Sequence, residues 1–240
     1  MSFVLIHLLI CSVVFPSTIS SQIDPANEWH ILFPKIRDRL ISKDEAQAKL
    51  KEVEGLLKEL FPKIVKSQKD DRLYFPLKGY SPHDIGGKDG SGYNVKDYDF
   101  FEGNAHKGHP GHDIFIRDSN QDGLDDRTEK PVEVVAAASG VVVSINFNWE
   151  TSSPIRGGNY IWIYEPAKRR YYYYAHLSEI FVKVGQIVSG GERLGTVGRT
   201  GVKSHSKRSP THLHFTVHQS TDGYPKPINP YWELVKGIKK

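Results

Sequence analysis

Histidines alternate with apolar residues in the segment 211–218, which reads THLHFTVH. As a β-strand, this segment places its histidines on one face and its leucine, phenylalanine and valine on the other. His212 and His214 then project side by side, roughly 7 Å apart at the backbone. Such a pair suits one metal ligand and one catalytic neighbour.

A second segment rich in metal-binding residue types lies upstream, in the run GHPGHDI. His109 and Asp113 are four residues apart in it, and the proline and glycine between them let the chain bend so that both side chains converge. His214 can supply the third ligand of a hydrolytic zinc site, which keeps a fourth position open for water. His212 then stays unligated beside the metal, and His176 can bring a second free imidazole from another strand.

Short strands separated by glycine-rich turns are expected to position these residues. After residue 72 the chain contains repeated β-type runs, which indicates a mainly β domain. The expected strands are 132–137, 140–146, 160–164, 171–177, 180–184, 195–198 and 213–218.

The region before the β domain is predicted to be helical. Ser42 and Glu45 form a capping-box pattern at the start of the segment 43–60, whose apolar residues recur at three- and four-residue steps. An earlier piece, 29–40, can pair with it as a helical hairpin. The pattern does not separate a structural spacer from a prosegment or a partner-docking arm. The expected division is a signal peptide (1–21), a helical segment with a linker (22–72), a β-rich domain that carries the metal-binding residue types (73–235) and a basic tail (236–240).

The N-terminus predicts export. Residues 3–15 are almost wholly apolar, too short to span a bilayer, and small residues follow them, as in a signal peptide. Met1 and Ser2 bring no lysine or arginine, and a short membrane anchor is the alternative. Removal of this segment leaves no transmembrane helix and also removes Cys11, the single cysteine. The expected location is the periplasm, the cell envelope or the extracellular space. Because no cysteine remains, histidine and carboxylate side chains must supply the ligands of any metal site.

The charge balance argues against nucleic acid as a partner. The chain has 32 basic and 28 acidic residues, a formal net charge of +4. This mild excess does not imply nucleic-acid binding, and it is compatible with an anionic polymer such as cell wall.

Further motifs follow one another in order: AAASGVV at 136–142, YAHL at 174–177, VGQIV at 184–188, GTVGRTG at 195–201 and HLHF at 212–215. With the His-x-x-x-Asp of His109 and Asp113, the set resembles the lysostaphin-like zinc endopeptidases of peptidoglycan, also called the LytM family. The resemblance runs over residues 75–231, about two-thirds of the chain. Each motif is weak evidence alone, whereas the ordered set is specific.

The resemblance implies an antiparallel β-sheet groove of the duplicated-hybrid-motif type, preceded by a small α-helical segment. It implies zinc held by His109, Asp113 and His214, with His176 and His212 as the catalytic pair. The resemblance also implies that the zinc ion lowers the pKa of its bound water to roughly 7. One histidine, by preference His212, assists deprotonation, and the other positions the scissile carbonyl or stabilises its oxyanion.

The implied reaction is hydrolysis of peptide bonds in the stem peptides or cross-bridges of peptidoglycan. One alternative is a non-catalytic wall-binding activator of another hydrolase, which predicts lost ligands, and none of the five positions is lost. The other is a zinc endopeptidase that acts on proteins.

An acidic loop between the two ligand segments predicts a calcium site. It matches the spacing of an EF-hand loop, in a β context without flanking helices. The alternative is an acidic turn. The expected calcium ligands are Asp118, Asn120, Asp122, the carbonyl of Leu124, Asp126 and Glu129, with Gly123 at the sharp turn.

Overall fold

The computed structural model of the protein describes residues 24–61, 72–206 and 209–240. The expected signal peptide, residues 1–21, and most of the expected linker, residues 68–72, lie outside these ranges. In the described ranges, no helix combines the length and the apolar character needed to cross a membrane.

Two helices open the described chain, α1 (Pro25–Arg37) and α2 (Lys43–Leu60). Ser42 Oγ accepts a hydrogen bond from the Glu45 N–H at 3.3 Å, so the predicted cap holds the first turn of α2. α1 begins earlier than residue 29, because the side chain of Asp24 accepts the free N–H groups of its first turn.

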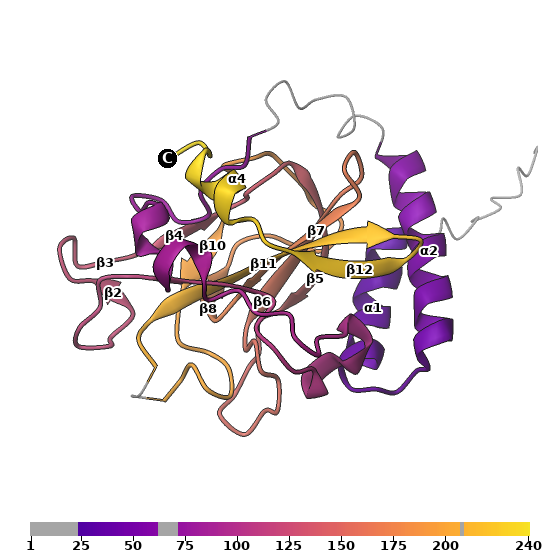
Figure 1. The fold of residues 1–240 in the computed structure, drawn as a ribbon, viewed down its shortest axis with the longest axis horizontal. Helices are drawn as coiled ribbons and strands as arrows, with labels where there is room; N and C mark the ends of the chain where they lie inside the picture. The colour runs from indigo at the N-terminus through magenta and orange to yellow at the C-terminus, as the bar shows by residue number, and fades with distance from the viewer. Residues whose placement is uncertain (1–23, 62–71, 207–208) are drawn as a thin grey trace, which may run out of the picture.

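The remaining chain is dominated by antiparallel strands, which confirms the predicted mainly β fold (Figure 1). The main sheet has the order β1–β11–β7–β6–β5–β9, and β12 pairs with β11 beyond the part that β1 occupies. A smaller sheet has the order β4–β10–β8, β2 pairs with β3, and a short helix α4 follows β12. The bounds are β1 Gly111–Phe115, β2 Leu124–Asp125, β3 Lys130–Pro131, β4 Glu133–Val135, β5 Gly140–Asn146, β6 Tyr160–Glu165, β7 Arg170–Ala175, β8 Leu177–Ile180, β9 Ile187–Val188, β10 Arg193–Val197, β11 His212–Thr221, β12 Tyr224–Ile228 and α4 Tyr231–Val235.

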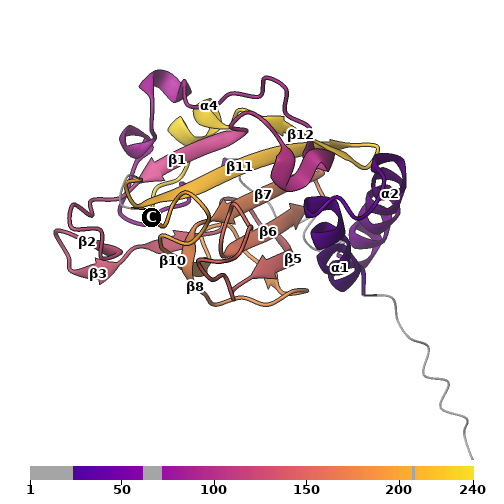
Figure 2. The ribbon, with the colours of Figure 1, turned by 90° about the horizontal axis from the view of Figure 1, so that it is seen from below.

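Both faces of the main sheet contribute to a core, because alternate side chains enter two different cores. On one face, Tyr172, Tyr174 and Phe215 belong to the core that also contains the small sheet. On the other face, Trp162 packs against Trp29 and Phe33 of α1. Figures 1 and 2 show the helical hairpin at one end of the molecule, opposite the β2–β3 hairpin.

Several strand predictions differ from the structure. The expected strand 171–177 is interrupted at His176, because β7 ends at Ala175 and β8 begins at Leu177 in the smaller sheet. The expected strand 180–184 is wrong: β8 ends at Ile180, and the chain turns at Gly185, which has a φ of +80°. β12 was not predicted because Pro225 and Pro227 lie within it. Proline is tolerated there because β12 pairs only with β11 and leaves its other edge free of ladder hydrogen bonds among the described strands.

Candidate active site

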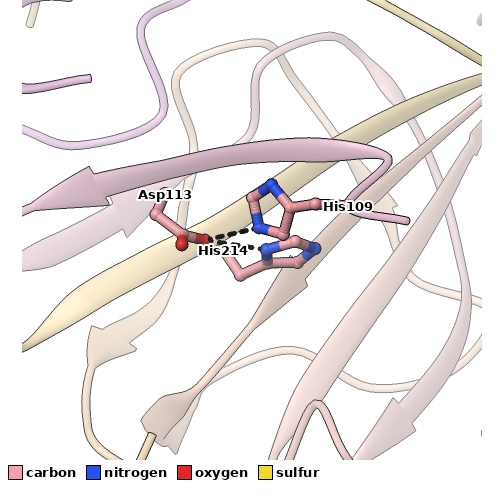
Figure 3. Close-up of side chains that lie close together, drawn as sticks. All are labelled: His109, Asp113 and His214. Atoms are coloured by element: carbon pink, nitrogen blue, oxygen red, sulfur yellow. Dashed lines mark hydrogen bonds and ion pairs between the residues drawn. The ribbon is translucent and has the colours of Figure 1, made fainter. Parts of the chain in front are cut away.

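Three side chains that can bind a metal ion meet where β1 lies beside β11 (Figure 3). Asp113 is directly opposite His214 in the strand register, and its Oδ1 lies 2.9 Å from His214 Nδ1. His109 lies in the loop before β1, with its Nε2 3.2 Å from the same oxygen. The three ligand atoms all lie within 4.8 Å of one another. The structure thus brings the predicted ligand set together.

The hydrogen bonds around this cluster favour a cation. His109 Nδ1 lies 2.9 Å from the carbonyl oxygen of Gly92, and because a carbonyl only accepts, Nδ1 carries the proton. If His109 is neutral, its Nε2 can only accept a hydrogen bond. This nitrogen faces the Asp113 carboxylate, which can also only accept. A proton or a metal ion must lie between them. Tetrahedral zinc, with bonds of about 2.0–2.1 Å, separates its ligands by roughly 3.3 Å, so these residues fit it.

Asp113 and His214 have the protonation states that metal ligands need. Burial alone would raise the pKa of Asp113, but hydrogen bonds from His109 and His214 outweigh it and hold that pKa well below its ordinary value. Burial lowers the pKa of His214. A carboxylate and a neutral imidazole are the forms that coordinate a metal.

His176 and His212 lie beside the cluster with a shared orientation. His176 Nδ1 lies 2.7 Å from the carbonyl oxygen of Thr200, and His212 Nδ1 lies 2.7 Å from that of Pro210. Each ring therefore carries its proton on Nδ1 and keeps Nε2 as an acceptor. The ring centroids are 4.9 Å apart, and His212 Nε2 is 3.6 Å from Asp113 Oδ1. Both predicted catalytic histidines thus adjoin the metal cluster.

The backbone around His176 is specialised. His176 follows β7 with a φ of +66°, a conformation that costs energy for a residue other than glycine. Gly201 packs against it with a φ of +111°, and a Cβ at this position would press on His176 Nδ1 and on the carbonyl oxygen of Arg156. The last glycine of the GTVGRTG motif is therefore required by the position of the imidazole.

These histidines line a cleft of about 480 Å³ on the face of the main sheet that also carries α1. Its walls come from α1, from the segment 98–110, from the turn between β5 and β6, and from residues 202–204 and Ser209. Sequence reasoning missed most of this wall, which carries no recognisable motif. The additional lining residues include Phe33, Arg37, Tyr98, Phe100, His106, Arg156, Tyr160, Trp162, Tyr173, Lys203 and His218.

His218 lies buried on the cleft side of β11, with its Nε2 3.0 Å from the hydroxyl of Tyr98. Burial lowers its pKa to about 3. An unfolded histidine has a pKa of about 6.5, so between these values the unfolded chain binds a proton that the folded chain does not. The folded state is therefore favoured above pH 6.5 and loses stability as the pH falls toward 3.

We expect His218→Gln to make folding less sensitive to acid. In the native protein, this one histidine should cost about 2 kcal/mol of unfolding free energy between pH 7 and pH 5. Urea unfolding at both pH values measures the difference, with His83→Gln, an exposed position, as the control. The same pH dependence in His218→Gln and in the native protein would contradict this assignment.

The acidic loop forms a turn held by its own hydrogen bonds. The carboxylate of Asp118 accepts the N–H groups of Asp122 at 3.0 Å and Gly123 at 2.9 Å, and Asp126 accepts from Ser119. Among the described residues, the cluster at β1 and β11 is the group of three or more side chains placed to hold a metal ion. The calcium prediction is thus not supported, because the loop carboxylates bind backbone N–H groups instead of converging.

Comparison with known proteins connects this site to a family. A family model described as peptidase family M23 matches residues 119–230, a range that includes His176, His212 and His214 and begins after His109 and Asp113. No curated protein sequence matches the chain.

Several solved structures resemble the chain. A zinc-containing peptidase from Vibrio cholerae is 22% identical with a TM-score of 0.42, over 71% of this chain and 41% of that chain. The catalytic domain of the antimicrobial peptidase lysostaphin from Staphylococcus simulans is 29% identical with a TM-score of 0.36, over 53% of this chain and 79% of that chain. The LytM protein of Ruminococcus gnavus is 21% identical with a TM-score of 0.46, over 91% of this chain and 94% of that chain. The chain thus spans less than half of the Vibrio protein.

The family match confirms the resemblance found in the motifs. The matched residues make up just under half of the chain, and over this range the chain is similar to peptidase family M23.

Proposed function

We propose that this protein is an exported zinc endopeptidase that hydrolyses peptide bonds of peptidoglycan. The observation that supports it most directly is the convergence of His109, Asp113 and His214 beside two further histidines, in the cleft of a chain that is similar to peptidase family M23. The apolar N-terminal run supports export. The mild positive charge suits an anionic wall.

In this proposal, His109 Nε2, His214 Nδ1 and an Asp113 oxygen hold the zinc ion. Two imidazoles and one carboxylate form a ligand set that leaves a position open for catalysis. Zinc at such a site supplies Lewis acidity, which lowers the pKa of water and polarises carbonyl groups. The carbonyl of Gly92 holds the His109 ring so that Nε2 faces the cluster.

His212 and His176 act on the proton and on the substrate. His212 is our choice for the base, because its Nε2 is an acceptor 3.6 Å from Asp113 Oδ1. It takes a proton from the attacking water and passes it to the nitrogen of the leaving amine. Burial lowers the pKa of His176 to about 3, so this ring stays neutral and positions the substrate.

His212→Gln should lower kcat by about 100-fold while the protein keeps its zinc, since general base catalysis contributes at least this much. Steady-state kinetics and metal analysis of the same sample measure both quantities. Loss of zinc together with activity would mean that His212 is a ligand instead. His83→Gln, at an exposed position outside the cleft lining, is the matched control and should leave both values unchanged.

Digestion of purified peptidoglycan by the mature protein, read by mass spectrometry, tests the proposed function. His214→Ala and a zinc-chelated sample are the controls, and casein serves as a protein substrate. New peptide ends that disappear in both controls support the proposal and identify the bond. Intact wall with zinc bound contradicts it, and cleavage of casein alone indicates a peptidase that acts on proteins.

A further inference from the structure

The cleft carries an excess of positive charge. Four charged side chains line it: Arg37, Asp113, Arg156 and Lys203. Arg37 is neutralised by Asp38, with Nε–Oδ1 and Nη2–Oδ2 distances of 2.8 and 2.6 Å. Asp113 is the only carboxylate among the described lining residues, and it is engaged by histidines. Arg156 and Lys203 therefore remain as cations, with no ion pair to any described residue.

Arg156 is a half-buried arginine that binds no described carboxylate and uses only one of its guanidinium nitrogens in hydrogen bonds to described residues. Arg117 and Arg170 each pair with a carboxylate. Arg199 pairs with no carboxylate, but it donates from both Nη1 and Nη2, to the side chains of Thr211 and Gln121 and to the carbonyl oxygen of Ser206. Half-buried Arg156 instead donates from Nη1 to backbone carbonyls, that of His106 at 2.9 Å and that of Asn104 at 3.4 Å. No hydrogen bond within the described residues uses its Nε or Nη2. These contacts hold the guanidinium in the cleft wall and leave donors for a ligand.

Arg156 lies in the wall of the cleft, beside its floor. Tyr173 pairs with Thr216 in the register of β7 and β11, two residues beyond His214 on the same face. The adjacent Gly157 lies so close to the Tyr173 hydroxyl that a Cβ there would collide with it. Arg156 also lines the same cleft as His109 and Asp113, and its Nη1 lies 3.4 Å from His106 Nε2. Arg156 thus stands beside the cleft floor next to the metal cluster.

The wall beyond Tyr173 is aromatic. Trp162 lies opposite Tyr173 in the β6–β7 pair, at a ring distance of 4.5 Å, and Phe33 of α1 lies 5.3 Å from Trp162. α1 therefore forms one side of the cleft. In Figure 2 this helix lies beside the strands β5 and β6. A peptide that reaches Arg156 has an apolar surface next to it, and the one carboxylate among the described lining residues, that of Asp113, is engaged by His109 and His214.

We infer that Arg156 determines substrate specificity by binding a carboxylate of the peptide that lies in the cleft. This inference rests on the proposed function. A guanidinium matches a carboxylate with two parallel N–H···O bonds, and a half-buried setting strengthens them. The carboxylate has two sources in a peptide, a free C-terminus or an acidic side chain near the cleaved bond.

Four synthetic peptides of one cleavable sequence separate these sources: the parent with both carboxylates, one with an amidated C-terminus, one with the acidic side chain amidated, and one with both amidated. The native protein should cleave the parent with a kcat/KM about 10- to 100-fold above the peptide that lacks the recognised carboxylate. Arg156→Gln should reduce this ratio to about 1 and leave the doubly amidated peptide unaffected. Arg156→Lys, which keeps the positive charge but cannot form two parallel hydrogen bonds with a carboxylate, should give an intermediate ratio.

Controls distinguish carboxylate binding by Arg156 from a structural role of Arg156 and from the overall positive charge of the cleft. If Arg156 only supports the loop of Asn104, Arg156→Gln slows all four peptides equally, which overturns the inference. Lys203→Gln removes one charge from the exposed rim and should change the ratio by about twofold or less. An equal loss of selectivity in Lys203→Gln would assign the effect to the overall field and overturn the inference as well. Arg193→Gln, on the exposed side of β10, should leave the ratio and the rate unchanged.

Equilibrium binding of the same peptides to zinc-loaded His212→Gln separates failure of this inference from failure of the proposed function. Selective binding that disappears in the double variant His212→Gln/Arg156→Gln, without cleavage by the native protein, supports the carboxylate site and rejects the peptidase proposal. Cleavage without selectivity rejects the carboxylate site alone. Absence of both cleavage and selective binding rejects both.

Discussion

Asp113→Asn should lose bound zinc and lower kcat/KM by about a thousandfold or more. The carboxylate of Asp113 is the shared partner of His109 and His214, at 3.2 and 2.9 Å, so its charge holds the cluster together. An amide keeps the shape and removes the charge that balances a divalent cation. Lewis acid catalysis contributes several kcal/mol to barrier lowering, and each 1.4 kcal/mol is about tenfold in rate.

Metal analysis and peptidoglycan digestion of the purified variant measure this prediction. Asp122→Asn is a matched control, because Asp122 is an exposed carboxylate in the acidic loop outside the cleft lining. It should retain both zinc and activity. Full activity of Asp113→Asn, or equal losses in the two variants, would show that the cluster at β1 and β11 is not the catalytic metal centre.

Trp29→Ala should destabilise the protein by about 3–5 kcal/mol, the range for removing a large buried aromatic side chain. Trp29 is completely buried, stacks on Phe33 at 5.1 Å and contacts Tyr171 of β7. Its Nε1 donates to the Tyr171 hydroxyl at 3.1 Å, and that hydroxyl donates to Glu54 of α2 at 2.9 Å. The substitution removes packing and one buried hydrogen bond together.

Chemical denaturation of the variant measures the loss of unfolding free energy. Ile31→Ala is the control in the same helix: Ile31 is 53% exposed, and its truncation should change stability by at most about 0.5 kcal/mol. A similarly small effect of Trp29→Ala would mean that α1 is a separable segment. The expected large effect would mean that the helical hairpin and the main sheet form one folded unit, since the side chains of the hairpin share a core with β5, β6 and β7.

Short-range sequence patterns determined several parts of this protein. The alternation along β11 placed His212 and His214 on one face, because side chains of a strand alternate whatever surrounds it. Ser42 marked the start of α2, since the free N–H groups of a first turn need an acceptor from the neighbouring residues. The His-x-x-x-Asp pair and the GTVGRTG turn were likewise visible as motifs.

Tertiary structure alone decided what surrounds those elements. The acidic loop has the residue spacing of a calcium site, yet its carboxylates bind the loop's own N–H groups. The spacing of residues in the sequence does not show which of these two arrangements the folded loop adopts. The role of α1 as a cleft wall depends on its burial against Trp162, far away in the sequence. Arg156 became a candidate for specificity only because the folded chain gives it backbone carbonyls as neighbours and no described carboxylate. Alternation and capping act between adjacent residues, whereas the composition of a cleft depends on which distant segments pack against one face of the sheet.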